Sequence, residues 1–414
     1  MVNINLYNNL GGFYMKLNVL AISHYHTGAN RTFEDYCYGI KANSNEYYYI
    51  DYKNDYTKLG KKRLESKIID LVKTKGINCI FFYLWARDFT FDILFIERLS
   101  KLTKIIMMFS DSYYSFEDCD SYYAQLADLV ILPAYLEKFQ FELIGINAMT
   151  TFSLFNKNAY LNDKIITQDI DISFVGNTSK SNRAEFIAFI ENNGLKVETF
   201  GRKSKNGFVD FDKMIQIFNS TKININFTGT ENYKKLMCGK KKLNRIKIIP
   251  GRIIEIALCG GFVLSEYAPG IEKMFRIGEE IDVFYSKEDL VKKIKYYLDN
   301  DQRRQEIANQ CYKHSISSYN STTAFKKILY NLQKLPKQEK VLFLDDIFLK
   351  NYVAYRIMYL GRFLLKFNLK LFLEEILIIL KVRKISPRLF YLFTFHGISV
   401  IFDKFRQERP EVLP

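Results

Sequence analysis

Short apolar runs recur along this sequence, and stretches with helical periodicity fall between them. Continuous runs without alternation are typical of strands buried on both faces of a parallel sheet. The order strand, helix, strand therefore predicts α/β domains with doubly wound sheets. The runs are Leu17–Ile22, Ile77–Leu84, Lys104–Phe109, Leu129–Leu132, Ala148–Phe152, Ile172–Val175, Val197–Phe200, Lys222–Phe227 and Phe262–Leu264.

The chain has 414 residues, which is long for one core, so two domains and an appendage are expected. We place them at 1–160, 161–335 and 336–414. The formal charge of +15 favours anionic partners such as nucleotide diphosphates, phospholipid head groups or nucleic acid, without choosing among them. The six cysteines show no C-x-x-C spacing and the N-terminus lacks a signal-peptide pattern, so a cytoplasmic protein is expected.

The stretch from Ile249 to Phe275 is typical of a short helix, a glycine turn and a buried strand. Arg252 and Glu255 lie three apart and share one face near the start of that helix, where a bound anion is favoured. A guanidinium and a carboxylate together suit a ligand that carries both phosphate and vicinal hydroxyl groups. The alternative is a weak i,i+3 salt bridge on a solvated helix face.

The motifs of this stretch are G-R-x-x-E-x-x-x-C-G-G-F from Gly251, E-Y-x-P-G-I-E from Glu266 and F-x-x-G-E-E from Phe275. Together they resemble the C-terminal domain of GT-B glycosyltransferases, most of all the spore-maturation (CgeB-like) branch. The resemblance implies two Rossmann-like domains that face each other across a crevice. It also implies that Glu255 holds the ribose of a nucleotide diphosphate sugar, and that Gly251, Arg252 and Gly260 belong to the donor site.

The larger relatives in this resemblance carry a second glutamate eight residues before the first. This chain has Lys247 there, so the retaining mechanism of those relatives does not carry over.

A second set of donor contacts is predicted after the run Ile172–Val175. Gly176 would let a phosphate approach the backbone, and Asn177 and Arg183 would add hydrogen-bond donors. The sequence F-V-G-N followed by an arginine recurs in the same branch, which supports this interpretation.

Two residues of the first domain are candidates for activating the acceptor. Ligands of open α/β sheets bind beyond the carboxyl ends of the strands, and His24 and Asp111 each follow an expected strand. An inverting transfer needs a base within reach of the acceptor hydroxyl, whereas a retaining one does not. Histidine titrates near neutrality, and the branch commonly has an aspartate at the position of Asp111. The alternative for His24 is a loop residue without a role.

The segment 336–414 has a net charge of +6 and an apolar stripe with helical spacing. Such a helix either lies on an anionic membrane or packs against the two domains, and the period is the same in both cases. The stripe comprises Ile347, Val353, Ile357, Leu360, Leu364, Phe367 and Leu371.

We expect a metal-independent glycosyltransferase of the hexosyl type, without a cofactor, that uses a nucleotide-sugar donor and a glycan or lipid-linked acceptor in cell-surface glycoconjugate synthesis. The spacings Asp118-Cys119-Asp120 and Asp169-Ile170-Asp171 match a manganese motif of the other glycosyltransferase fold, but they lie in the wrong local context. Two alternatives are a catalytically silent relative and a basic nucleic-acid-binding protein. No specific nucleic acid is expected, because the aromatic residues lie largely in strand runs.

Overall fold

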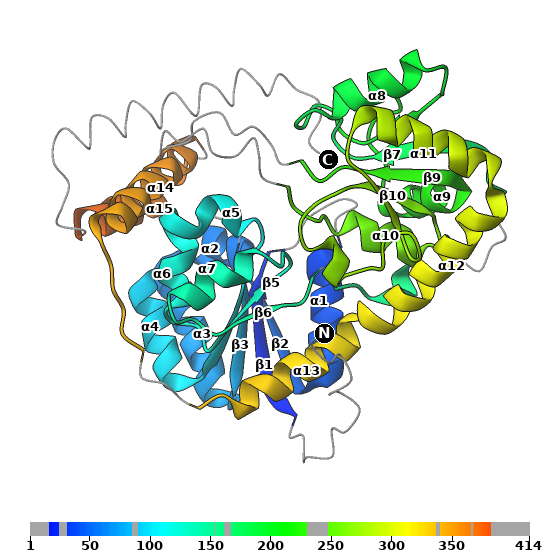
Figure 1. The fold of residues 1–414 in the computed structure, drawn as a ribbon. Helices are drawn as coiled ribbons and strands as arrows, with labels where there is room; N and C mark the ends of the chain where they lie inside the picture. Colours follow the sequence, from blue (N-terminus) through cyan, green and yellow to red (C-terminus); the bar gives the residue numbers. More distant parts are fainter. Residues whose placement is uncertain are drawn as a thin grey trace.

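A computed structural model describes residues 16–24, 31–84, 90–152, 154–160, 167–229, 247–336, 340–365 and 367–381. Its first sheet has six parallel strands in the order β2-β1-β3-β4-β5-β6 (Figure 1). The apolar runs form its inner strands because their side chains are buried on both faces. The strands are β1 (Leu17–Ser23), β2 (Ser44–Asp51), β3 (Cys79–Tyr83), β4 (Lys104–Met108), β5 (Leu129–Leu132) and β6 (Ala148–Thr150).

Helices cover both faces of this sheet. They are α1 (Thr32–Asn43), α2 (Tyr52–Leu59), α3 (Lys61–Thr74), α4 (Ile93–Leu102), α5 (Ser112–Ser115), the π-helical turn η1 (Phe116–Asp120), α6 (Ser121–Ala124) and α7 (Glu137–Leu143).

The second sheet has five parallel strands in the order β11-β10-β9-β7-β8. The strands are β7 (Ile170–Val175), β8 (Glu198–Phe200), β9 (Thr221–Asn226), β10 (Val263–Glu266) and β11 (Asp282–Phe284). The helices of this half are α8 (Arg183–Asn192), α9 (Phe211–Ser220), α10 (Arg252–Leu258), α11 (Lys287–Asp299) and α12 (Asp301–Ser318), with short turns η2 (Lys157–Ala159) and η4 (Ile271–Lys273). The doubly wound α/β architecture predicted from the sequence is confirmed.

The chain returns to the first sheet before the predicted boundary at residue 335. Helix α13 (Ser321–Lys334) buries Phe325 and Leu329 in the same cluster as β1 and α1. Gly39 of α1 packs so closely on this helix that an added Cβ would lie 2.5 Å from the Ser321 carbonyl oxygen. The return crossing therefore lies near Tyr319, and Figure 1 shows α13 running beneath the first domain.

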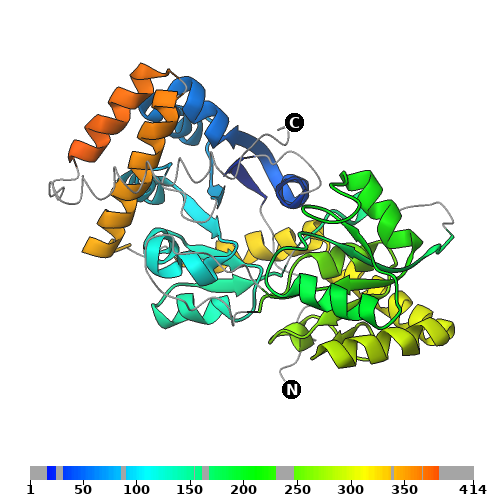
Figure 2. The same ribbon diagram turned by 90° about the horizontal axis from the view of Figure 1, so that it is seen from above.

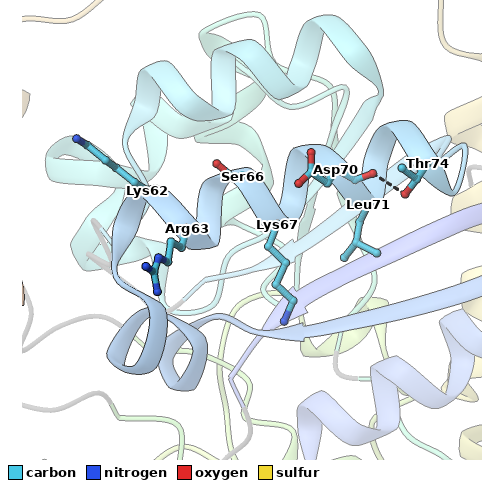
Figure 3. A pocket seen from close by; sticks show the side chains of 7 residues that line it. All are labelled: Lys62, Arg63, Ser66, Lys67, Asp70, Leu71 and Thr74. Atoms are coloured by element: carbon cyan, nitrogen blue, oxygen red, sulfur yellow. Dashed lines mark hydrogen bonds between the residues drawn. The ribbon is translucent and has the colours of Figure 1, made fainter.

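Helix α3 is amphipathic. Leu64, Ile68 and Val72 face the core, whereas the outward side borders an open hollow of about 500 Å³ (Figure 3). The hollow is lined by Lys62, Arg63, Ser66, Lys67, Asp70, Leu71 and Thr74. A single helix face forms it, so it is a surface feature of the first domain.

The described part of the tail forms a helical hairpin, α14 (Asp346–Leu365) and α15 (Leu369–Lys381), that packs on the first domain. Phe348, Tyr352 and Leu371 join the main core cluster of that domain. Figure 2 shows the hairpin on the side of the first domain that faces away from the second domain. Of the predicted stripe, Val353, Ile357 and Leu371 are buried, whereas Ile347 and Phe367 are exposed. Packing against the first domain and within the hairpin therefore explains why several residues of the predicted stripe are apolar.

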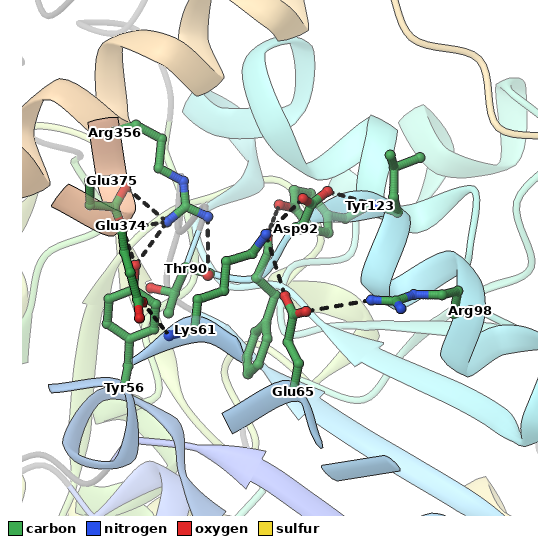
Figure 4. Close-up of polar contacts among 12 residues, drawn as sticks. Tyr56, Lys61, Glu65, Thr90, Asp92, Arg98, Tyr123, Arg356, Glu374 and Glu375 are labelled. Atoms are coloured by element: carbon green, nitrogen blue, oxygen red, sulfur yellow. Dashed lines mark hydrogen bonds and ion pairs between the residues drawn. The ribbon is translucent and has the colours of Figure 1, made fainter. Parts of the chain in front are cut away.

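A buried ion pair holds the hairpin closed. Arg356 Nη1 lies 3.1 Å from Glu375 Oε1, and both side chains are almost fully buried (Figure 4). Tyr56 donates to the same carboxylate, and Arg356 Nη2 donates to the Thr90 carbonyl (3.2 Å). The pair thus joins α14 and α15 to α2 and to the loop after β3.

Because the pair is buried, removing one charge should be costly. We expect Glu375→Gln to lower the free energy of unfolding by about 3–5 kcal/mol, since Arg356 then keeps a buried charge without its counter-ion. The matched control is Glu374→Gln, at a half-exposed neighbour that accepts from the Lys61 backbone (3.3 Å), with an expected loss below about 1 kcal/mol. Urea unfolding measures both, and equal losses would contradict this role of the pair.

Candidate active site

The strand orders place a switch point in each sheet. Strand β1 pairs with β2 on one side and β3 on the other, and β7 pairs with β8 and β9 in the same way. Loops leave such neighbouring strands in opposite directions, which opens a ligand-binding position at the carboxyl edge. His24 follows β1 and Gly176 follows β7, so the structure places both predicted residues at the switch points.

The carboxyl edges of the two sheets face each other. The Arg31 guanidinium, just before α1, lies 4.8 Å from the ring centre of Phe211, the first residue of α9. Tyr135, after β5, packs against Gly270, after β10, where an added Cβ would lie 3.2 Å from the Tyr135 side chain. Residues from both halves therefore surround the same region.

Arg252 and Glu255 share one face of α10, as their spacing predicts. The guanidinium Nη1 lies 3.0 Å from Glu255 Oε2, and its carbon lies 5.5 Å from the ring centre of Phe218. The two side chains keep 27% and 12% of their surface exposed, so ligand atoms can reach them. Gly251 directly precedes the helix, and Gly260 ends it with a φ of 75°, the left-handed conformation expected there.

Lys247 forms an ion pair where the relatives have their second glutamate. Its Nζ lies 2.9 Å from Oε1 of the buried Glu266 at the end of β10. Oε2 of Glu266 accepts from the Thr228 backbone (3.0 Å) and from Gly229 (3.3 Å). The pair thus ties the loop after β9 to β10. The basic and polar segment Thr228–Arg245 is expected from the sequence to form a loop over the donor site, and its residues 230–245 lie outside the described residues.

The loop after β7 is held in shape by its own residues. Gly176 donates its N–H to the Phe200 carbonyl (2.7 Å), and an added Cβ would lie 2.7 Å from the Phe174 ring. Asn177 accepts from the Ser179 N–H (3.0 Å). Arg183 stacks on Phe174 and donates to the carbonyls of Asn177 (3.1 Å) and Gly229 (3.4 Å). Arg183 therefore braces the loops on both sides of the second switch point.

His24 is paired with a carboxylate. Its Nδ1 lies 2.8 Å from Asp51 Oδ1, and Asp51 also caps α2 by accepting from the Asn54 N–H (3.1 Å). When Nδ1 is the donor in this contact, Nε2 is left as the proton acceptor. An imidazole oriented by a fixed carboxylate has the arrangement of a general base. The sequence prediction named His24 but not Asp51, because strand β2 was not recognised.

Asp111 lies in a strained turn at the end of β4. Its φ of 59° is left-handed, which is uncommon for a residue with a side chain, and a π-helical turn follows within the same loop. Asp120 fixes this loop by accepting from the hydroxyls of Ser112 (2.5 Å) and Ser115 (2.6 Å). Strained backbone of this kind is often held at functional sites.

Glu137 supports the same loop and was missed from the sequence. Its Oε1 accepts from the Tyr113 N–H (3.1 Å), and burial raises the pKa of its carboxyl to about 8, with smaller contributions from Asp111 and Asp120. A neutral carboxyl group therefore lies close to Asp111 at neutral pH. Nothing in the local sequence distinguishes Glu137 from a solvated helix residue, since its burial arises only in the fold.

Asp35 was also missed from the sequence. It is completely buried on α1, where Tyr160 donates to its Oδ2 (3.2 Å), while Oδ1 makes no hydrogen bond and lies 3.9 Å from Arg31 Nε. Burial raises the pKa of Asp35 to about 7, and the charge of Glu255 adds to the rise. Asp35 thus connects the first domain electrostatically to the predicted donor site.

The described residues include no group of three or more His, Cys, Asp and Glu side chains arranged to hold a metal ion. Asp120, from the first D-x-D spacing, accepts hydrogen bonds from the hydroxyls of Ser112 and Ser115. Asp171, from the second, forms an ion pair with Lys222 (2.6 Å). Within the same described ranges, no helix is long and apolar enough to cross a membrane.

Comparison with known proteins identifies the fold. Residues 181–329 match the model of a family described as glycosyl transferase-like. The solved structure of Anabaena Alr3699/HepE in complex with UDP is similar, with 12% identity and a TM-score of 0.55, over 77% of this chain and 100% of that chain. This is the GT-B fold.

Two further solved GT-B structures are similar to this chain over nearly the same share of its length. A glycosyltransferase from Rickettsia africae ESF-5 is 10% identical, with a TM-score of 0.55 over 78% of this chain and 100% of that chain. Sucrose-phosphate synthase from Thermosynechococcus elongatus is 9% identical, with a TM-score of 0.53 over 77% and 99%. No protein of curated function matches the sequence. The two parallel sheets with their helices are the Rossmann-like halves of this fold.

The raised pKa of Asp35 predicts a pH dependence of stability. A carboxyl whose pKa is higher in the folded state than in the unfolded state favours folding less as the pH rises from about 4 to about 7. Asp35→Asn removes this titration. Its free energy of unfolding relative to the parent protein should therefore rise by about 3 kcal/mol between pH 5 and pH 8.

Urea unfolding at the two pH values checks this. The control is Glu34→Gln, at the exposed neighbour that pairs with Arg31 (3.5 Å), for which the difference from the parent should not change with pH. A pH-independent difference for Asp35→Asn would show that Asp35 is charged in the folded protein.

Proposed function

We propose that the protein is a glycosyltransferase that moves a sugar from a nucleotide diphosphate sugar to a hydroxyl group of a glycan or lipid-linked acceptor. The observation that carries this proposal is the Arg252–Glu255 pair on α10, within the segment that matches the glycosyl transferase-like family model. The fold supports it, since solved GT-B neighbours hold UDP and UDP-glucose.

In the proposed complex the donor lies at the switch point of the second sheet. Glu255 accepts hydrogen bonds from the ribose hydroxyls, and the backbone around Gly176 and Asn177 approaches the diphosphate. Arg252 and Arg183 supply positive charge where the leaving diphosphate develops negative charge, and this is the largest contribution that such a site makes to the rate. The chain's own cations thereby take the role that a metal has elsewhere, so we propose a metal-independent transfer of a hexosyl group.

On the acceptor side, two positions on the carboxyl edge of the first sheet offer a base. His24 with Asp51 follows β1 and β2, and Asp111 with Glu137 follows β4 and β5. Strand β3 alone separates β1 from β4, so the two groups are about 10 Å apart along the edge. We propose an inverting reaction in which His24 accepts the proton and Asp111 orients the acceptor or the base. Membership of the spore-maturation (CgeB-like) branch, and a role in cell-surface glycoconjugate synthesis, are part of this proposal.

Glu255→Gln tests the donor site. The amide keeps the shape but weakens a charge-assisted hydrogen bond, so the affinity for UDP or another nucleoside diphosphate should fall by about 1.5–3 kcal/mol in calorimetric titration. Glu279→Gln, at an exposed glutamate of the same domain, is the control and should bind as the parent does. Unchanged affinity in Glu255→Gln would remove Glu255 from the donor site.

The base is tested by the product anomer and by two variants. Inversion, with a loss of turnover of at least about a hundredfold in His24→Ala or Asp111→Asn, is the expected result for a general base. NMR of the product gives the anomer, and donor titration shows whether each variant still binds. Retention, or near-normal turnover in both variants, would contradict the assignment. A protein that binds donors but turns over none would be the catalytically silent alternative.

A further inference from the structure

Helix α15 carries apolar residues on two opposite faces. Leu371 and Ile379 face inward and are buried against the first domain and α14. A second set points outward, at spacings of four, four and three that place it on one stripe. This outer stripe consists of Leu369 (66% exposed), Leu373 (57%), Leu377 (59%) and Leu380 (64%). A helix that is apolar on both sides normally has both sides covered.

The outer stripe adjoins a largely apolar hollow, whose wall also includes the charged residues Lys61, Lys62, Asp92 and Glu374. A cavity of about 360 Å³ lies between α15, α14 and the start of α4, and Leu377 is part of its wall. Leu94, which is 55% exposed, lines the same hollow, as do Leu349 and Ile378. The exposed apolar surface is therefore contiguous and crosses three helices, which marks an interaction site in a soluble protein.

Cations border this apolar surface. Lys62 lines both the hollow and the open outward face of α3, where Arg63 and Lys67 follow it (Figure 3). Lys370 is exposed on α15 beside the stripe. Exposed leucines flanked by lysine and arginine form the pattern of a surface that lies on anionic lipid.

We propose that the outer stripe of α15, the adjoining hollow and the cations of α3 dock this protein onto an anionic phospholipid bilayer. The leucines enter the boundary between head groups and acyl chains, and Lys62, Arg63 and Lys370 contact lipid phosphates. These residues differ from the apolar stripe expected from the sequence, most of which packs inside the hairpin. The overall charge of +15 has the sign that such docking needs.

The docking surface is connected to the proposed acceptor side. Arg356 of α14 donates to the Thr90 carbonyl in the loop after β3, so the same hairpin touches the carboxyl edge of the first sheet. Docking would therefore hold that edge near the membrane, where lipid-linked acceptors are found. This link rests on the proposed function, whereas docking itself does not.

Vesicle flotation with the full chain tests docking. The parent protein should float with vesicles of phosphatidylglycerol and phosphatidylcholine, and much less with phosphatidylcholine alone or at high salt. Leu373→Ser combined with Leu377→Ser should lower the partition coefficient at least tenfold. The matched control is Leu143→Ser with Phe208→Ser, at residues 86% and 71% exposed outside this surface, which should leave it unchanged. Lys62→Glu with Arg63→Glu should weaken binding and flatten its salt dependence.

Thermal unfolding and donor titration of each variant show that fold and donor site are intact, so a failed donor site and failed docking give different results. Equal flotation of the Leu373→Ser, Leu377→Ser variant and the parent would overturn the proposal, as would absence of parent binding to anionic vesicles. A stripe-dependent dimer in light scattering, without vesicle binding, would assign the stripe to a second copy. Vesicle binding that appears only after deletion of 382–414 would show that this segment, and not a membrane, covers the stripe in the full chain. Either the dimer or this deletion result would overturn the proposal.

Discussion

The chain crosses between the two domains twice, and helix α1 contacts both connecting segments. The arrangement of the two halves depends on these contacts. At its start, Asp35 accepts from Tyr160 on the outgoing connection, and Arg31 covers Phe211. Farther along, Gly39 lies directly against Ser321, and Asn43 Nδ2 donates to the Thr322 carbonyl (2.7 Å) on the return. Only a glycine fits at position 39, so the helix and the returning α13 are fixed at backbone contact distance. This contact keeps the two carboxyl edges facing each other.

Among the buried carboxyl groups near these regions, Glu375, Asp35 and Glu137 are accommodated in two ways. Glu375 is paired with Arg356 and closes the hairpin. Asp35 has the more distant Arg31 Nε at 3.9 Å, and Glu137 accepts from the Tyr113 N–H; burial raises their pKa values to about 7 and about 8. Burying a charge without a close partner is costly, so the neutral form is favoured instead. Two acids whose pKa values lie near neutral pH therefore lie close to the residues proposed to bind the donor and the acceptor.

The sequence predicted the inner strands well because a strand buried on both faces needs a continuous apolar run. It also predicted the left-handed Gly260 and the shared face of Arg252 and Glu255, which depend on local spacing. Strand β2 was missed, since SNEYYYID lies at the sheet edge and is half exposed. Asp35, Asp51 and Glu137 were missed because their partners come from distant segments. The two alternatives for the tail predict the same helical spacing, and the fold decides for packing of α14, which buries Tyr352, Val353 and the Arg356–Glu375 pair.

The central claim is that the carboxyl edge of the second sheet binds a nucleotide diphosphate. A crystal structure of the protein with UDP tests it most directly. The account predicts ribose hydroxyls within hydrogen-bond distance of Glu255, and the diphosphate beside Arg252 and the backbone at Gly176. A nucleotide bound elsewhere, for example on the cations of α3, with the Arg252–Glu255 pair unchanged at 3.0 Å, would contradict it.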